Sequence, residues 1–305
     1  MVSNIWLPSD RHNDATHHAL IYYVCGNPGL IEYYTDFLKL LRGLLDKVEN
    51  DTAYDIYGRN LFGFVDDEHE SSGPENQLWD LNGQIEGIYD DVAARRVDSK
   101  PYDFVILMGH SVGSYICVEI FHRHLESPER APHLNLRHGF LLFPTLTHIA
   151  RSNSGLKFTA LRRAVPFLDT TTHIIARLLF SFLTVAGLTW LVQRVMGFTP
   201  LAASVTARWL KSRNGRDGVK NSGPQAKDQK GDAPRFFVFY AKSDHWVDDG
   251  EREGFIERRR GGVTRIEVDE GDIPHAFCTR DDASLEVARR VCGWVEEIDR
   301  VGENH

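Results

Sequence analysis

The sequence predicts an α/β fold in which helices cover both faces of a mostly parallel central sheet. Between residues 19 and 145, short apolar runs typical of strands alternate with stretches of helical periodicity, which is the pattern of parallel strands joined by helical crossovers. The strand pattern stops after Pro144 and resumes at Arg235. A single α/β core interrupted by an insertion is the simplest account of this order.

The predicted strands are apolar runs bounded by Gly, Pro or Asp, as expected of parallel strands that are buried on both faces. The predicted helices carry apolar residues at helical spacing. The strands are expected at 19–25, 54–57, 104–108, 140–143, 235–240 and 263–268, and the helices at 33–49, 78–95, 115–123 and 284–298.

The composition fits one globular core with an insertion, because 42% of the 305 residues are hydrophobic and 26% are charged. We expect the core to comprise residues 1–145 and 235–305. A helical cap is expected over 146–210, where no convincing strand pattern occurs. Residues 211–234 are polar, contain several Gly and Pro residues and have almost no apolar side chains, which predicts a flexible linker.

The charge and the cysteine content of the chain limit the binding partners and the cellular compartment that we expect. The net charge of −8 argues against nucleic acid as a partner. The four cysteines have no metal-binding spacing and the N-terminus has no signal-peptide pattern, so we expect a location on the cytosolic side. The sequence contains no glycine-rich phosphate loop and no His/Cys metal motif, and we expect neither a cofactor nor a metal.

The strongest chemical signal is the pentapeptide Gly-His-Ser-Val-Gly centred on Ser111. It lies between a predicted strand and a predicted helix. In that context the G-x-S-x-G pattern predicts a nucleophile elbow, in which the serine occupies a strained turn and the two glycines leave room for close packing. The elbow indicates an α/β-hydrolase fold with Ser111 as a covalent nucleophile.

An acid and a base must follow the serine in chain order in this fold. Asp244 lies just after the first strand pattern that follows the insertion, and Asp248 and Asp249 are alternatives. His275 lies on a turn after the next strand pattern, whereas His245 shares the loop of the acid. We therefore expect His275 to act as the general base and Asp244 to orient it.

The oxyanion of acyl transfer requires preorganised hydrogen-bond donors. The backbone N–H of Val112, directly after the nucleophile, is the first expected donor. The second should come from the loop after an early strand, where Asn27 is preferred because Pro28 has no N–H, and Gly29 is an alternative. Turn formation alone would also explain the Pro and Gly residues of this loop.

An apolar run at residues 174–192 stands out within the expected cap. Between Arg177 and Arg194 the uncharged stretch is 16 residues long, which is shorter than the ~17–25 residues of a spanning helix. We therefore expect this run to contact a lipid surface without spanning it, with flanking arginines near the headgroups. A cap helix that is buried against the core and lines an acyl pocket is compatible with the same pattern.

Four motifs contain or adjoin the expected site residues: CGNPGLIEYY at 25–34, GHSVGSYI at 109–116, SDHW at 243–246 and IPHAF at 273–277. Together they resemble the motifs of the lipid droplet-associated hydrolase family. The resemblance implies a triad of Ser111, Asp244 and His275, sterol or neutral-lipid esters as substrates, and a location on lipid droplets or the endoplasmic reticulum. It also implies that residues 174–192 bind the droplet. The alternative is a droplet-associated protein that organises lipid and has weak or secondary esterase activity.

Overall fold

The computed structural model describes residues 2–48, 51–64, 79–146, 183–212 and 235–302, and also residues 152, 154, 156, 157 and 160. A seven-stranded sheet with the order β1-β3-β2-β4-β5-β6-β7 forms the centre of the molecule. Among these strands, β1 alone runs antiparallel to its neighbour, β3, and the other pairs are parallel. The strands are β1 (Asn4–Leu7), β2 (His17–Val24), β3 (Thr52–Arg59), β4 (Phe104–His110), β5 (Leu136–Leu142), β6 (Arg235–Tyr240) and β7 (Arg265–Val268).

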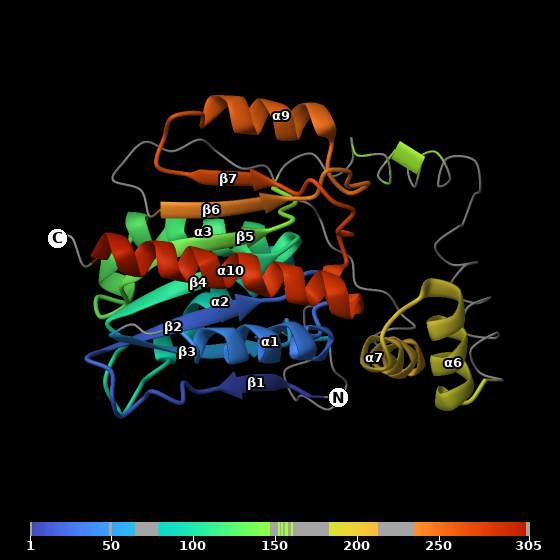
Figure 1. Cartoon of the computed structure of the whole chain (residues 1–305), viewed down its shortest axis with the longest axis horizontal. Helices are drawn as coiled ribbons and strands as arrows, with labels where there is room; N and C mark the ends of the chain where they lie inside the picture. Colours follow the sequence, from blue (N-terminus) through green and yellow to red (C-terminus); the bar gives the residue numbers. More distant parts are fainter. Residues whose placement is uncertain are drawn as a thin grey trace.

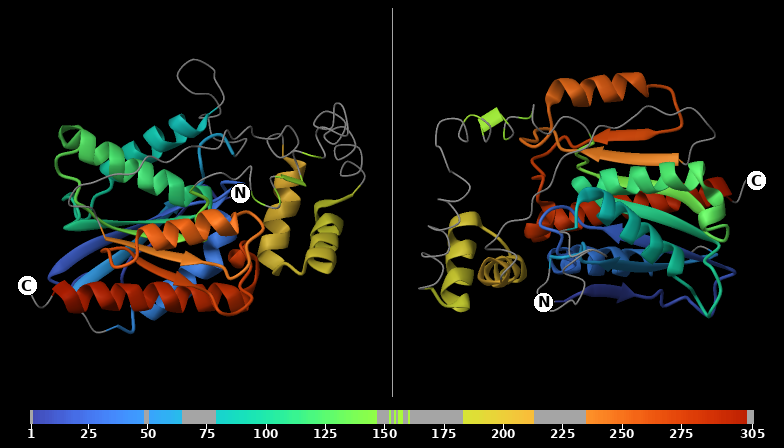
Figure 2. Two further views of the ribbon diagram at one scale, coloured as in Figure 1. Left: turned by 90° about the horizontal axis from the view of Figure 1, so that it is seen from above. Right: turned by 180° about the vertical axis from the view of Figure 1, so that it is seen from behind.

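Helices cover both faces of this sheet, which confirms the predicted α/β-hydrolase fold class (Figures 1 and 2). The helices α1 and α10 pack together on one face, and α2 and α3 lie on the other. The α-helices are α1 (Thr35–Leu45), α2 (Leu81–Ala94), α3 (Val112–Glu126), α6 (Val185–Met196), α7 (Pro200–Lys211), α9 (Asp249–Arg258) and α10 (Asp281–Gly302), and the short 3-10 helices are η1 (Ile31–Tyr34), η2 (Pro128–Arg130) and η4 (Phe277–Thr279).

Continuous apolar runs form the central strands because both faces of each strand are buried. All seven residues of β4 are buried, and six of the eight residues of β2 are buried. Each predicted strand overlaps an observed one. The edge strand β1 was not predicted because only Ile5 of its four residues is buried. The helix α9 was not predicted either, since it has no buried residue and therefore no apolar stripe.

The register of the sheet brings the carboxyl ends of the parallel strands together. Val24 at the end of β2 pairs with Gly109 in β4, and Leu142 at the end of β5 pairs with His110. Tyr240 at the end of β6 pairs with Val268 at the end of β7. Loops that leave these strand ends therefore meet at one edge, where open α/β sheets bind their ligands.

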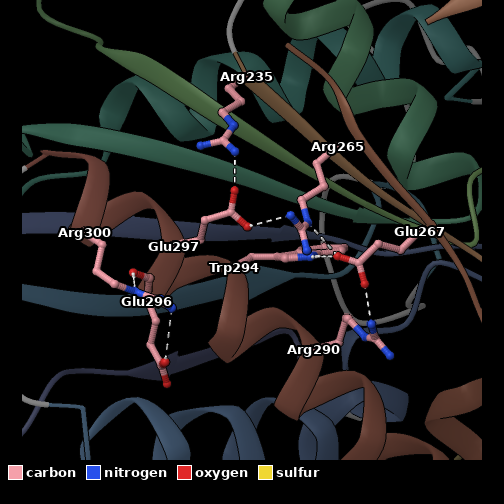
Figure 3. Close-up of polar contacts among 8 residues, drawn as sticks. All are labelled: Arg235, Arg265, Glu267, Arg290, Trp294, Glu296, Glu297 and Arg300. Carbon is pink, nitrogen blue, oxygen red and sulfur yellow. Dashed lines mark hydrogen bonds and ion pairs between the residues drawn. The ribbon is translucent and has the colours of Figure 1, made fainter. Parts of the chain in front are cut away.

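An ion-pair network joins α10 to β6 and β7 (Figure 3). Glu267 on β7 accepts hydrogen bonds from Arg265 at 2.9 Å, from the indole N–H of Trp294 at 3.0 Å, and from Arg290. Glu297 on α10 pairs with Arg265 at 3.3 Å and also with Arg235. The network fixes the helix against the two strands that lead to the loops of Asp244 and His275.

The helices α6 and α7 lie beyond the end of the sheet to which the parallel strands point (Figure 1). The helix α7 contacts η1 and η4 of the core. The Tyr33 and Thr206 hydroxyls are 2.7 Å apart, Arg208 pairs with Glu32 at 2.6 Å, and the N–H of Thr199 donates to the Thr279 carbonyl at 3.0 Å.

Other parts of the expected insertion lie outside the described residues. These are most of the predicted linker 211–234, the first half of the apolar run 174–192, and much of 146–182. The division into core, cap and linker thus stays a prediction. Within the described ranges, the helices are all too short or too polar to cross a membrane.

Candidate active site

Ser111 occupies a strained turn between β4 and α3. Its backbone has φ 54° and ψ −121°, a conformation that is rare for a residue with a side chain. Hydrogen bonds hold the turn in place, because the Ser111 N–H donates to the Leu142 carbonyl at 3.0 Å and the Ser111 carbonyl accepts the Ser114 N–H at 3.1 Å. The serine side chain therefore projects at the carboxyl edge of the sheet.

The two glycines of the pentapeptide allow the turn to pack closely. A Cβ atom at Gly113 would lie 2.3 Å from the Val24 carbonyl oxygen and 2.6 Å from that of Cys25. A Cβ atom at Gly109 would lie 2.5 Å from the carbonyl carbon of Gly113. Only glycine at these positions lets the first turn of α3 contact the end of β2. This contact places the loop after β2 directly beside Ser111.

The structure brings Ser111, His275 and Asp244 into one hydrogen-bonded series. The Ser111 Oγ lies 2.9 Å from His275 Nε2, and His275 Nδ1 lies 2.6 Å from Asp244 Oδ2. The side chains of Asp244 and His275 are 2% and 10% exposed. With Nδ1–H donating to the carboxylate, Nε2 is free to accept the serine proton, which is the arrangement that activates a serine nucleophile.

Asp244 is held as a carboxylate by its partners. Burial raises the pKa of this group, but the hydrogen bond from His275 and the backbone N–H of Trp246, at 2.9 Å, outweigh burial and lower the pKa below its ordinary value. The second carboxylate oxygen is thus satisfied by the backbone of its own loop. This fixes the orientation of the carboxylate toward the imidazole.

The alternatives that the sequence left open have other roles in the structure. Asp248 caps α9 by accepting the Glu251 N–H at 3.0 Å, and Asp249 pairs with Arg252 at 3.0 Å. His245 is exposed. Among the acids considered for the triad, Asp244 is the one that contacts His275.

The expected oxyanion donors lie on either side of Ser111. Val112 begins α3, where backbone N–H groups have no intrahelical acceptor. A Cβ atom at Gly26 would lie 3.1 Å from that of Ser111, so the loop containing Asn27 borders the nucleophile. The alternative donor Gly29 gives its N–H to the Gly26 carbonyl at 2.7 Å. Asn27 is exposed and remains the candidate from this loop.

Three further residues hold the segments around the triad and were not predicted from the sequence. Tyr34 and His110 are hydrogen-bonded at 2.8 Å, and His110 Nε2 lies 2.9 Å from the His275 carbonyl oxygen. Asp269 accepts the Ile273 N–H at 3.1 Å and so supports the loop of His275. The position of Asp269, directly after a predicted strand, was a usable signal, whereas nothing in the sequence connects Tyr34 with His110.

The side chains at the carboxyl edge of the sheet can carry out nucleophilic and acid–base chemistry. No group of three or more His, Cys, Asp or Glu side chains within the described part of the chain is arranged to hold a metal ion. The four cysteines are buried, and burial raises the pKa of each thiol. Ser111 is therefore the nucleophile that the geometry favours.

Comparison with known families and proteins gives consistent matches. A family model described as lipid-droplet associated hydrolase matches residues 17–278. A mouse protein named lipid droplet-associated hydrolase is 27% identical over 297 residues, which cover 90% of this chain and 84% of that protein. A rat protein with the same name is 26% identical over 296 residues, again covering 90% of this chain and 84% of that protein.

Solved structures with a similar fold are distant in sequence. The Vlm2 thioesterase domain has a TM-score of 0.53 and 14% identity, covering 94% of this chain and 97% of that one. The serine hydrolase CarC, which is involved in carbazole degradation, has a TM-score of 0.52 and 14% identity, covering 95% of this chain and 93% of that one. At this level of identity the likeness shows the fold alone.

Proposed function

Because the chain belongs to the lipid-droplet-associated hydrolase family, we propose that it is a serine hydrolase of neutral-lipid esters, sterol esters among them. The observation that carries this proposal is the series in which His275 lies 2.9 Å from Ser111 Oγ and 2.6 Å from Asp244. The names of the mouse and rat relatives point to the same reaction class.

The proposed reaction is a two-step acyl transfer. His275 takes the proton of Ser111 as the serine oxygen attacks the ester carbonyl, and the oxyanion is stabilised by Val112 and Asn27. His275 then gives the proton to the departing alcohol, which leaves an acyl-serine. A water molecule, deprotonated by His275, attacks the acyl-serine, and the fatty acid is released as His275 returns the proton to the Ser111 oxygen. Asp244 stabilises the imidazolium that forms in each step.

We further propose that the protein acts at the surface of lipid droplets, on the cytosolic side, or at the endoplasmic reticulum. Large apolar side chains are exposed along α6 and just before it, including Trp190 at 64% and Val195 at 74%. They lie in and directly after the predicted lipid-contact run 174–192. Exposed apolar residues grouped on one element are typical of a surface that binds lipid or another partner.

The enzymatic proposal is tested with an emulsion of cholesteryl esters and triacylglycerols. Wild-type protein and the variant Ser111→Ala are incubated with the emulsion, and the released fatty acids and alcohols are measured by mass spectrometry. We expect wild type to release acid from at least one ester class and Ser111→Ala to release none above the rate without protein. Equal release by the two proteins would contradict the proposal.

A second candidate function, a droplet-associated protein that organises lipid with secondary esterase activity, is favoured by the exposed side chains of α6. Flotation with phospholipid-coated triacylglycerol droplets tests this surface. The double variant Trp190→Ser/Val195→Ser should lose droplet binding. Val263→Ser removes an apolar side chain that is 66% exposed outside the cap and should bind like wild type. If Ser111→Ala floats normally and no ester is hydrolysed by wild type, the second function is supported over the first.

A further inference from the structure

We propose that Tyr34 and His110 are positioning residues that connect the loop after β2 with the loop of His275, so that the oxyanion donors and the general base keep a fixed relation to Ser111. The proposal rests on the proposed function, because it assigns a role within the same site. It concerns two side chains that touch neither the serine hydroxyl nor the Asp244 carboxylate in the hydrogen bonds of the described residues.

A continuous series of hydrogen bonds links four segments of the chain. The Gly26 N–H lies 3.1 Å from Tyr34 Oη, Tyr34 Oη lies 2.8 Å from His110 Nδ1, and His110 Nε2 lies 2.9 Å from the His275 carbonyl oxygen. The members come from the loop after β2, from η1, from the last residue of β4 and from the loop before η4. Contacts between residues so far apart in the chain fix those segments relative to one another.

Donor and acceptor chemistry allows one direction for this series. A carbonyl oxygen only accepts, so His110 must carry a proton on Nε2. Burial lowers the pKa of His110 to about 3, so the ring is neutral and its Nδ1 accepts. The Tyr34 hydroxyl must therefore donate to Nδ1, which leaves its oxygen free to accept the Gly26 N–H. Every polar atom of the series then has a partner.

Aromatic packing excludes water from the series. Tyr34 and His110 are 2% and 3% exposed. The His110 ring lies 5.2 Å from that of Phe277 and 6.2 Å from that of Phe143. A lost hydrogen bond in such a site cannot easily be replaced by solvent, and an unpaired buried polar group is costly. Replacement of either the Tyr34 or the His110 side chain would therefore disturb this series of hydrogen bonds.

Both ends of the series reach groups with a proposed catalytic role. At one end, His110 holds the backbone of His275, whose imidazole contacts Ser111 and Asp244. At the other end, Tyr34 holds Gly26, and the Gly26 carbonyl accepts the Gly29 N–H at 2.7 Å. Because C=O and N–H point in opposite directions across a trans peptide, this bond also sets the direction of the Asn27 N–H. A shift of either the His275 backbone or the peptide between Gly26 and Asn27 would change the position of the catalytic groups around the ester carbonyl carbon.

The variant Tyr34→Phe tests the proposal, with Tyr89→Phe as a matched control. Tyr89 is fully buried and its hydroxyl is also 2.8 Å from a histidine Nδ1, that of His124, but the pair lies between α2 and α3. The rate of hydrolysis of p-nitrophenyl butyrate is measured against its concentration, together with the melting temperature and the rate of Ser111 labelling by a fluorophosphonate probe. The full-length chain is used throughout.

We expect Tyr34→Phe to lower kcat and the labelling rate by on the order of 10- to 100-fold with KM little changed, since misplacement by about 1 Å has that effect. Tyr89→Phe should lower the melting temperature by a similar or smaller amount, because its hydrogen bond to His124 is only partly buried, and should leave kcat unchanged. His110→Gln should retain a higher kcat than His110→Leu, because the glutamine amide can still donate to the His275 carbonyl.

The outcomes separate this proposal from the proposed function. If wild type itself is neither labelled nor active, the proposed function fails. If wild type is active and Tyr34→Phe has the kcat of wild type, the positioning role is refuted while the triad stands. Equal losses of kcat in Tyr34→Phe and Tyr89→Phe would also refute it, because the effect would then follow stability and not the position of the pair.

Discussion

Replacement of Gly113 by alanine tests the close contact on which the turn at Ser111 depends. The added Cβ would lie 2.3 Å from the Val24 carbonyl oxygen, whereas ordinary contacts of a Cβ atom begin at 3.4 Å. The difference requires the first turn of α3 and the end of β2 to separate by about 1 Å. Both partners are backbone atoms, so no side chain can rotate away to relieve the overlap.

The expected cost follows from this overlap. Overpacking of this kind destabilises a protein by about 1–3 kcal/mol, which outweighs the gain in helix propensity, ~1 kcal/mol or less at a helix end. For a chain of this size the melting temperature should fall by about 2–10 °C. A shift of about 1 Å between Ser111 and the loop of Asn27 should lower kcat by roughly 100-fold.

Gly293→Ala is the matched control for this substitution. Gly293 lies within α10, and a Cβ atom there would meet nothing within 4 Å. Alanine at this position should raise the free energy of unfolding by ~0.5–1 kcal/mol and leave activity unchanged. Denaturant unfolding and ester hydrolysis are measured for both variants. If Gly113→Ala is as stable and as active as wild type, the contact between α3 and β2 is not what shapes the turn.

Two further predictions concern the acid and the buried histidine. Asp244→Asn should lower kcat by on the order of 10³- to 10⁴-fold. Asp248→Asn should keep activity and stability, because asparagine caps a helix as well as aspartate does. A loss of kcat with Asp248→Asn but not with Asp244→Asn would reverse the assignment of the triad acid. Burial lowers the pKa of His110 from 6.5 to about 3, so as the pH falls from about 6.5 to about 3 the unfolded chain takes up a proton that the folded protein does not, and stability is lost. At pH 5 the stability lost in this way is about 2 kcal/mol. The free energy of unfolding of His110→Gln should therefore fall less steeply with decreasing pH than that of wild type. Parallel curves of unfolding free energy against pH for the two proteins would contradict this prediction.

The sheet could be predicted because its central strands are buried on both faces. Continuous apolar runs between Gly, Pro and Asp marked β2, β4, β5 and β6, and the position of Ser111 between a strand and a helix marked the turn. The chain order of serine, acid and histidine then directed attention to Asp244 and His275, which the structure places in contact with one another and, through His275, with Ser111.

Other features could not be predicted because no local pattern encodes them. The four residues of β1 form an edge strand with mixed exposure, and α9 lacks an apolar stripe. Phe143 has a φ of 46°, although aromatic residues disfavour that region and no glycine marks the turn. The contact of Tyr34 with His110 joins residues 76 positions apart, and only the packed sheet brings them together.

Covalent labelling of Ser111 tests the central claim most directly. Folded wild-type protein is treated with a fluorophosphonate, digested and mapped by mass spectrometry, beside the variants Ser111→Ala and His275→Gln. The predicted result is one phosphonylated serine at position 111 in wild type, no adduct in Ser111→Ala and a strongly reduced labelling rate in His275→Gln. Folded wild-type protein that forms no Ser111-dependent adduct would contradict the assignment of this chain as a serine hydrolase.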